Sequence, residues 1–117
     1  MDQAIKTEWV AALRSGEYQQ GSGYLRDLDG KYCCLGVLCD IAVKRGVIPD
    51  PSTNAYAFKY GGGPADDVYL PVAVMEWAGL DATNPTVPHE GEQEKLSAIN
   101  DNYHPFTEIA DLIDAHL

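Results

Sequence analysis

The chain has 117 residues, of which 18 are acidic and 8 are basic, giving a formal net charge of −10. A chain of this length can bury its own core, so we expect a single globular domain over residues 1–117. Such a negative charge repels phosphate backbones and anionic lipid head groups, which argues against nucleic-acid and membrane binding. Apolar residues form 45% of the chain, a share typical of folded proteins and not of disordered ones.

The compartment can be inferred from the N-terminus and the cysteines. Residues 1–6 carry no apolar secretory segment, and no run of the chain approaches the roughly 20 apolar residues needed to cross a bilayer. Cys33, Cys34 and Cys39 are odd in number and include an adjacent pair, which makes a poor disulfide framework. We therefore expect a cytoplasmic protein in a reducing environment.

The first half of the chain predicts two helices and a hairpin. Apolar residues at three- and four-residue spacing predict an amphipathic helix over residues 5–13. The Asp29-Gly30 turn between residues 24–26 and 31–33 is typical of a β-hairpin. The helical spacing returns from residue 35 and ends at Gly46, which predicts a second and largely buried helix.

The middle of the chain predicts a second hairpin and a third helix. Aromatic residues alternate over residues 56–60 as in a strand, and the apolar run 68–70 is its expected partner. Between them Gly61-Gly62-Gly63-Pro64 is interpreted as a turn, because the Lys-Ser/Thr of a phosphate-binding loop does not follow. Pro71 suits the first residue of a helix that ends at Gly79.

The last third predicts one long loop and two helices. The proline- and glycine-containing stretch 81–91 is predicted to be an exposed loop, followed by a brief helix over residues 92–99 and a turn over residues 100–102. Pro105 opens a final amphipathic helix. The predicted fold is thus α+β, with about five short helices packed with one or two small antiparallel β-hairpins.

Several segments of the chain, in order, resemble an uncharacterised family of small proteins from tailed bacteriophages and prophages. The most specific is Tyr-Cys-Cys-Leu-Gly-Val-Leu-Cys-Asp at residues 32–40. The others are Trp9 to Gly16 with Tyr18, Gln20 and Gly21; Leu70-Pro71 with Trp77 and Gly79-Leu80; Leu96-Ser97 with Asn100-Asp101; and Phe106 to Ile113.

The resemblance covers nearly the whole chain and implies a phage or prophage setting, hence the cytosol of a bacterial host. It implies no reaction, cofactor or catalytic residue. One departure is Pro105, which stands where the relatives have serine or another small capping residue before the last helix. Proline needs no hydrogen-bond donor in a first helical turn, so the helix itself is still expected.

The cysteines could serve as metal ligands or as nucleophiles. Cys33 and Cys34 are adjacent, so on a strand they point to opposite faces, and no Cys-x-x-Cys or nearby histidine completes a zinc site. A nucleophilic cysteine would need a nearby histidine, and His89, His104 and His116 are all predicted to be exposed. We therefore predict buried apolar thiols, no metal site, no cofactor and no catalytic residue, and we keep a cysteine-dependent hydrolase as a minor alternative.

A set of polar residues flanks the predicted core segments and forms the candidate site. In a structural role, the arginines would pair with Asp40 or Asp101 and cap helix ends, and Asn100-Asp101 would form an Asx-turn. In a functional role, Arg14 and Arg26 would hold a small anionic ligand. The candidate residues are Arg14, Gln20, Tyr24, Arg26, Asp40, Asn100 and Asp101.

Tyrosines are dense around the predicted hairpins and leave two readings of function open. A rigid aromatic face favours a macromolecular partner, so the preferred hypothesis is a non-enzymatic phage accessory protein that binds a host or phage protein, such as a defence component. The alternative is a small-molecule binder that sequesters a nucleotide-derived signal. Association of the chain with itself is a third use for the same aromatic residues.

Overall fold

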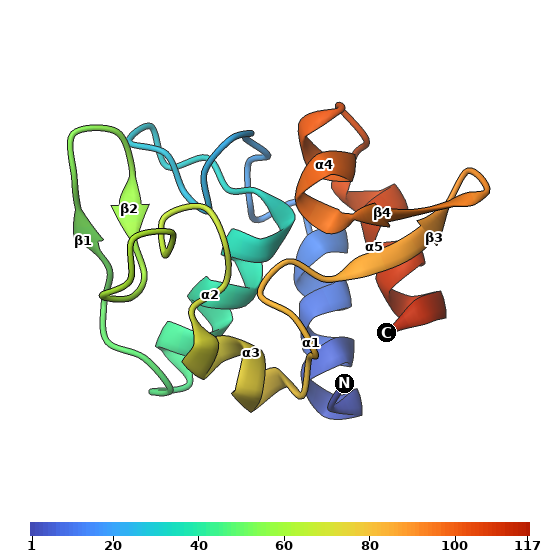
Figure 1. Ribbon diagram of the computed structural model, residues 1–117, viewed down its shortest axis with the longest axis horizontal. Helices are drawn as coiled ribbons and strands as arrows, with labels where there is room; N and C mark the ends of the chain where they lie inside the picture. Colours follow the sequence, from blue (N-terminus) through green and yellow to red (C-terminus); the bar gives the residue numbers. More distant parts are fainter.

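The computed structural model describes residues 1–117 and has the predicted α+β fold, with five helices and two separate two-stranded antiparallel sheets (Figure 1). None of the helices combines the length and apolar composition needed to cross a bilayer. The elements, in chain order, are α1 (Gln3–Arg14), α2 (Cys34–Lys44), β1 (Ser52–Thr53), β2 (Phe58–Lys59), α3 (Val72–Ala78), β3 (Thr86–His89), β4 (Glu92–Lys95), α4 (Leu96–Asp101) and α5 (Phe106–His116).

Helix α2 lies at the centre of the molecule, as its continuous apolar sequence predicts. Eight of its 11 residues are buried, because other elements cover almost its whole circumference. Figure 1 shows it between the loops around β1 and β2 on one side and α1, α4 and α5 on the other. Gly36 allows the closest approach: a Cβ atom there would lie 1.8 Å from the carbonyl oxygen of Leu25. The chain around Leu25 therefore packs directly against the helix backbone.

On one side of α2, helices α1 and α5 pack against each other and the β3–β4 hairpin covers part of α5. Trp9 of α1 is fully buried and donates its indole N–H to the carbonyl of Cys34 over 2.9 Å. The apolar face of α5 contributes Ile109, Ala110 and Ile113 to the same core. The predicted first, second, third and last helices are all present.

The predicted loop over residues 81–91 and the predicted helix over 92–99 are partly wrong. Thr86–His89 and Glu92–Lys95 form an antiparallel hairpin, joined by Glu90 and Gly91, both with positive φ. Helix α4 therefore starts only at Leu96, and the predicted turn at Asn100 is the last turn of that helix. The sequence pattern does not indicate this hairpin, because its only buried side chains are Val87 and His89, on one face of β3.

The two hairpins predicted upstream are also only partly correct. Residues 24–33 form a tight loop with a single antiparallel bridge between Arg26 and Tyr32, and no regular strand. Strand β2 pairs with β1 and not with residues 68–70. The reason is local: the side-chain oxygen of Asn54 accepts the N–H groups of Tyr56 and Ala57, which turns the chain back immediately.

Candidate functional site

Three of the candidate residues, Gln20, Asn100 and Asp101, come together although 80 positions separate the first two. The Gln20 amide donates to the side-chain oxygen of Asn100 over 2.9 Å and to the carbonyl of His104 over 2.8 Å. Asp101 accepts the backbone N–H of Gly23 over 3.1 Å. We call Gln20, Asn100 and Asp101 the polar knot; it fastens the loop after α1 to α4.

Asn100 is only 2% exposed and uses its side chain fully. Its oxygen accepts the N–H of Cys34 over 3.2 Å, and its NH₂ group donates to the carbonyl of Gly21 over 2.8 Å and to Asp101 over 3.1 Å. Two backbone groups and the side chains of Gln20 and Asp101 take up every bond this amide can make, so we assign it a structural role. The predicted Asx-turn is replaced by these longer-range bonds.

The polar knot also caps two helices whose own N-cap residues make no side-chain hydrogen bond. Cys33 precedes α2 and Pro105 precedes α5, and neither caps its helix. The side-chain oxygens of Asn100 and Gln20 do so instead, accepting the first N–H groups of α2 and α5, on Cys34 and Phe106. Gln20 thereby supplies the capping hydrogen bond that the side chain of Pro105 cannot make.

Asp40 and Arg14 take partners other than those predicted. Asp40 lies on α2, where it accepts the hydroxyl of Tyr18 and pairs with Lys44 over 3.1 Å. Partial burial and the Asp40 carboxylate raise the pKa of Tyr18 to about 12. Arg14 pairs with Asp111 of α5 over 2.7 Å, in an exposed position. The predicted pairing of an arginine with Asp40 or Asp101 is therefore wrong.

Arg26 lies away from Arg14, so the structure does not bring the two predicted anion-binding arginines together. The guanidinium carbon of Arg26 is 4.0 Å from the ring centre of Phe58 and 5.2 Å from that of Tyr32. Its Nε is buried without a hydrogen-bond partner. Its side chain thus stacks as a cation on aromatic rings. Tyr24, the last candidate, lines a small hollow with Asp101 and Tyr69.

The three cysteines are all buried and free, as predicted. Burial raises the pKa of the Cys33 thiol to about 11 and the pKa values of Cys34 and Cys39 well above the ordinary value. Thiols in this state are weak nucleophiles. The Cys34 sulfur contacts the carbonyl oxygen of Leu96 at 3.7 Å, and the hydrogen bonds of His89 and His104 go to glutamates.

The exposed residue that sequence reasoning missed is Tyr103. Its side chain is 91% exposed, and its backbone has a φ of 67°, a left-handed conformation that favours glycine. It follows the C-cap of α4, where its N–H bonds to the carbonyl of Asn100 and the next N–H, of His104, bonds to Ile99. This is a Schellman ending, whose left-handed residue is usually glycine. The backbone conformation is strained for tyrosine, and the ring is left in solvent.

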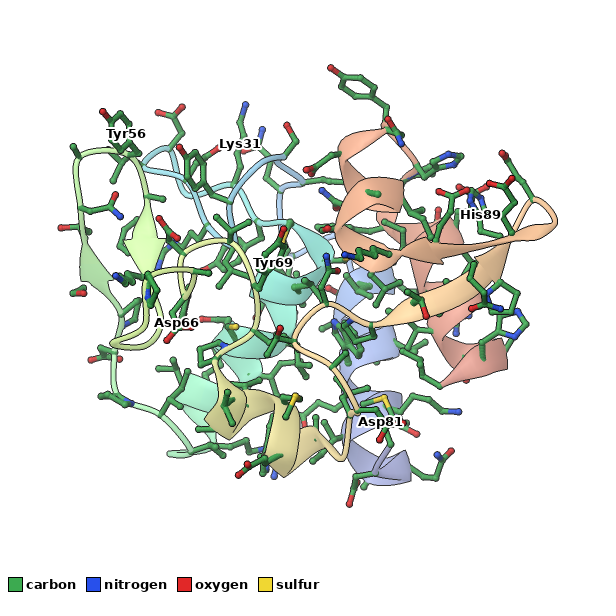
Figure 2. The ribbon with its side chains drawn as sticks, in the orientation of Figure 1. Lys31, Tyr56, Asp66, Tyr69, Asp81 and His89 are labelled. Atoms are coloured by element: carbon green, nitrogen blue, oxygen red, sulfur yellow. The ribbon has the colours of Figure 1, made fainter.

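Tyr103 lines a hollow of about 370 Å³ together with Gln20, Gly21, Ser22, Asp27 and Lys31. The backbone bridge between Asp27, which lines the hollow, and Ala57 brings two further exposed residues beside it, Leu28 at 53% and Tyr56 at 70% exposure. Figure 2 shows Tyr56 and Lys31 along the same upper edge of the molecule. We call the surface made of this hollow, which Lys31 and Tyr103 line, and of the neighbouring residues Leu28 and Tyr56 the loop edge.

A larger hollow of about 580 Å³ lies elsewhere, between the β1–β2 loops and the start of α3. Its polar lining includes Lys59, Asp50 and Asp66, and Tyr60 forms part of its wall. Tyr60 is 2% exposed and its hydroxyl has no hydrogen-bond partner. Neither predicted arginine lines this hollow. It has the volume of a small-molecule site.

The prediction that all three histidines are exposed is wrong for His89, which is 8% exposed on the inner face of β3. His104 is half-buried beside it, and only His116 is exposed. Two groups of side chains around them could each hold a cation: His89 with His104 and Glu108, and His89 with Glu90 and Glu94. No spacing of cysteines could have indicated these groups, because they contain none.

The chain belongs to the family described as a domain of unknown function, DUF8296, whose match covers residues 1–117. No curated protein and no solved structure matches it.

Proposed function

We propose that the protein is a phage or prophage accessory protein that binds a host or defence protein through the loop edge, without a catalytic step of its own. The observation that carries the proposal is Tyr103. A left-handed backbone at a non-glycine residue costs of the order of 1 kcal/mol or more. The Tyr103 side chain is 91% exposed, so packing inside the fold does not offset this strain energy. A contact outside the fold accounts for tyrosine at this position.

The character of the loop edge supports a protein partner. Tyr56 and Tyr103 are large, amphipathic and rigid, which suits them to be anchors of an interface. The hollow that Tyr103 lines can admit a side chain of the partner. The resemblance to phage proteins supplies the biological setting. Because the buried thiols are weak nucleophiles, a binding function is favoured over a cysteine-based reaction.

The charge indicates which partner surface fits. The chain carries a net charge of −10, and Asp27, Asp29 and Asp101 lie on or beside the loop edge. Arginine and lysine side chains of a partner would find carboxylates to pair with and tyrosine rings to cover. The partner we propose is a folded protein with a basic patch, whose affinity falls as salt concentration rises.

The test begins with affinity capture from a bacterial host lysate and continues with the purified partner. We expect one stoichiometric protein, and we expect Tyr103→Asn and Tyr56→Ala each to weaken its binding about 30-fold or more. Asparagine tolerates the left-handed conformation, so Tyr103→Asn keeps the α4 ending intact. The matched control is Val72→Ser, which alters another exposed apolar side chain, at the start of α3.

Three results would count against a partner at the loop edge. They are repeated capture of nothing above background, a captured protein that binds Tyr103→Asn as tightly as the wild type, and an affinity that salt does not change.

A second candidate function, small-molecule binding, is favoured by the 580 Å³ hollow. The ligand would contact Lys59, its only cationic lining residue, and the Tyr60 wall. A thermal-shift panel of cyclic and ADP-ribose-type nucleotides tests this function, because a ligand that binds only the folded chain raises its melting temperature. A real hit should be lost in Lys59→Ala and kept in Tyr103→Asn, which separates the two functions. A panel without any shift leaves this candidate unsupported.

A further inference from the structure

His89, His104 and Glu108 converge from three different segments of the chain: strand β3, the loop before α5, and α5 itself. One ligand atom from each lies within 4.8 Å of the other two. A second group, His89 with Glu90 and Glu94, meets the same criterion and shares His89 with the first. Figure 2 shows His89 at the end of β3, near the tip of the hairpin. We call His89, His104 and Glu108 the histidine cluster.

The hydrogen bonds around His89 leave one of its nitrogens available. Nδ1 lies 3.1 Å from a carboxylate oxygen of Glu94, which can accept its proton. In that tautomer Nε2 carries the lone pair, and Glu90 is the acidic group on that side, at 3.8 Å. A buried imidazole whose second nitrogen is held by a carboxylate is the arrangement that metal-bound histidines adopt.

His104 and Glu108 complete the donor set. The two side chains face each other one helical turn apart, with His104 Nδ1 against a carboxylate oxygen of Glu108. The rings of His89 and His104 meet edge to face, with their centres 4.7 Å apart. Donors of a tetrahedral zinc ion lie about 3.3 Å from one another. Side-chain rotations that move the donor atoms by roughly an ångström would bring these groups to that spacing. Glu108 is partly exposed and free to make such a rotation.

From this geometry we infer that the histidine cluster is a binding site for a divalent transition-metal ion of the zinc type, with His89, His104 and Glu108 as ligands. Imidazole nitrogens with carboxylate oxygens favour zinc and its neighbours over magnesium or calcium, which prefer oxygen alone. Glu90 or water takes the fourth position. Glu94 is a positioning residue, because it holds the His89 ring without contacting the ion.

The bound ion would join the β3–β4 hairpin to α5. Its ligands lie at His89 on the hairpin and Glu108 on the helix, so binding fixes one element against the other. The loop edge contributes none of the three ligands. Zinc binding by the purified chain therefore tests the histidine cluster without a protein partner.

Titration calorimetry of ZnCl₂ into the chelator-treated 117-residue chain tests the site. We expect one equivalent per chain with a dissociation constant of about 1 µM or below, and no comparable binding of MgCl₂. Co²⁺ in the same site should show the intense visible absorption of a four-coordinate ion. His104→Gln and Glu108→Gln, both in partly exposed positions, should each weaken zinc binding at least about 100-fold, and Glu94→Gln about 10-fold with unchanged stoichiometry.

The matched control is His116→Gln, the same substitution at an exposed histidine outside the cluster, at the end of α5, which should bind zinc like the wild type. Melting temperatures measured without metal confirm that each variant is folded. The site is refuted if zinc does not bind at about 100 µM, or if His104→Gln and Glu108→Gln bind it as His116→Gln does. In either case the cluster is a set of histidine–glutamate hydrogen bonds and nothing more.

Discussion

The two sides of helix α2 are stabilised in different ways. On the side of α1, α4 and α5, helices bury continuous apolar faces, and Trp9, Leu96, Ile99 and Ile109 are completely inaccessible. On the other side, residues 17–33 and 47–71 contain only two strands of two residues each. There, side-chain oxygens of Asp27, Asn54 and Asp66 accept backbone N–H groups and replace the missing regular structure.

The difference explains where a binding surface can form. Helices that bury apolar faces leave mainly polar residues outside, whereas the loops are shaped by short polar side chains and can hold large residues in solvent. Leu28 and Tyr56 are examples. The loops still need a firm attachment to the helices, which the contact at Gly36, the polar knot and the Tyr18–Asp40 bond provide. Removing each attachment in turn tests this view.

The largest effect is expected at Gly36. In Gly36→Ala the new Cβ would lie 1.8 Å from the carbonyl oxygen of Leu25, so α2 and the loop must move apart. We expect a loss of about 3 kcal/mol in the free energy of unfolding, measured by urea denaturation. Gly62→Ala is the control, since that Cβ would meet no atom within 4 Å, and its effect should stay within about 0.5 kcal/mol. Equal stabilities of the two variants would contradict the close contact.

The polar knot should give the next largest effect. Asn100→Ala leaves the N–H of Cys34 and the carbonyl of Gly21 buried without these partners, which should cost about 2 kcal/mol. Asn102→Ala, two residues along at an exposed position, should cost much less. Urea denaturation measures both, and hydrogen exchange should show faster exchange at the loop of residues 19–24 in Asn100→Ala. If Asn100→Ala loses no more free energy of unfolding than Asn102→Ala, the polar knot does not stabilise the fold.

The sequence indicated most of the helices well and the hairpins poorly, for a physical reason. Helix periodicity and the ends at Gly46 and Gly79 are local signals, so they predicted α1, α2, α3 and α5. Strands β3 and β4 lack such a signal, because β4 reads Glu-Gln-Glu-Lys and β3 contains Pro88. Val87 is the only apolar residue that this hairpin buries, so its sequence resembles that of a loop.

The candidate site shows the same limit. The sequence singles out Gln20, Asn100 and Asp101 as polar residues beside core segments, but no spacing could show that the first two bond across 80 positions. Tyr103 was missed because nothing in the sequence indicates a left-handed backbone at a tyrosine. The histidine cluster was missed because His89 was placed in an exposed loop, whereas the strand turns it inward.

A smaller effect is expected where Tyr18 bonds to Asp40. Tyr18→Phe should cost about 1 kcal/mol at neutral pH, the usual value of one hydrogen bond. Because the pKa of Tyr18 is raised to about 12 in the fold, the folded state keeps this proton in a range where the unfolded chain loses it. The stabilisation is therefore complete below about pH 10 and disappears as the pH rises towards 12.

Urea denaturation of Tyr18→Phe and the wild type at pH values from about 8 to 12 measures this trend, and the two stabilities should converge at the alkaline end. Tyr24→Phe is the control, because the Tyr24 hydroxyl makes no hydrogen bond within the fold, and its difference from the wild type should not change in this way. A difference for Tyr18→Phe that stays constant through this range would contradict the pKa shift.

The smallest effect has the opposite sign. Tyr103→Gly replaces tyrosine at the left-handed residue after α4 with the residue that this conformation favours. The relief of strain exceeds the entropy that glycine adds to the unfolded chain, so we expect a gain of about 0.5 kcal/mol in the free energy of unfolding. The control is Glu90→Gly, at the other non-glycine residue with positive φ, which should gain a similar amount. If Tyr103→Gly destabilises the fold while Glu90→Gly does not, the Tyr103 ring contributes to folding, and its exposure no longer argues for a partner.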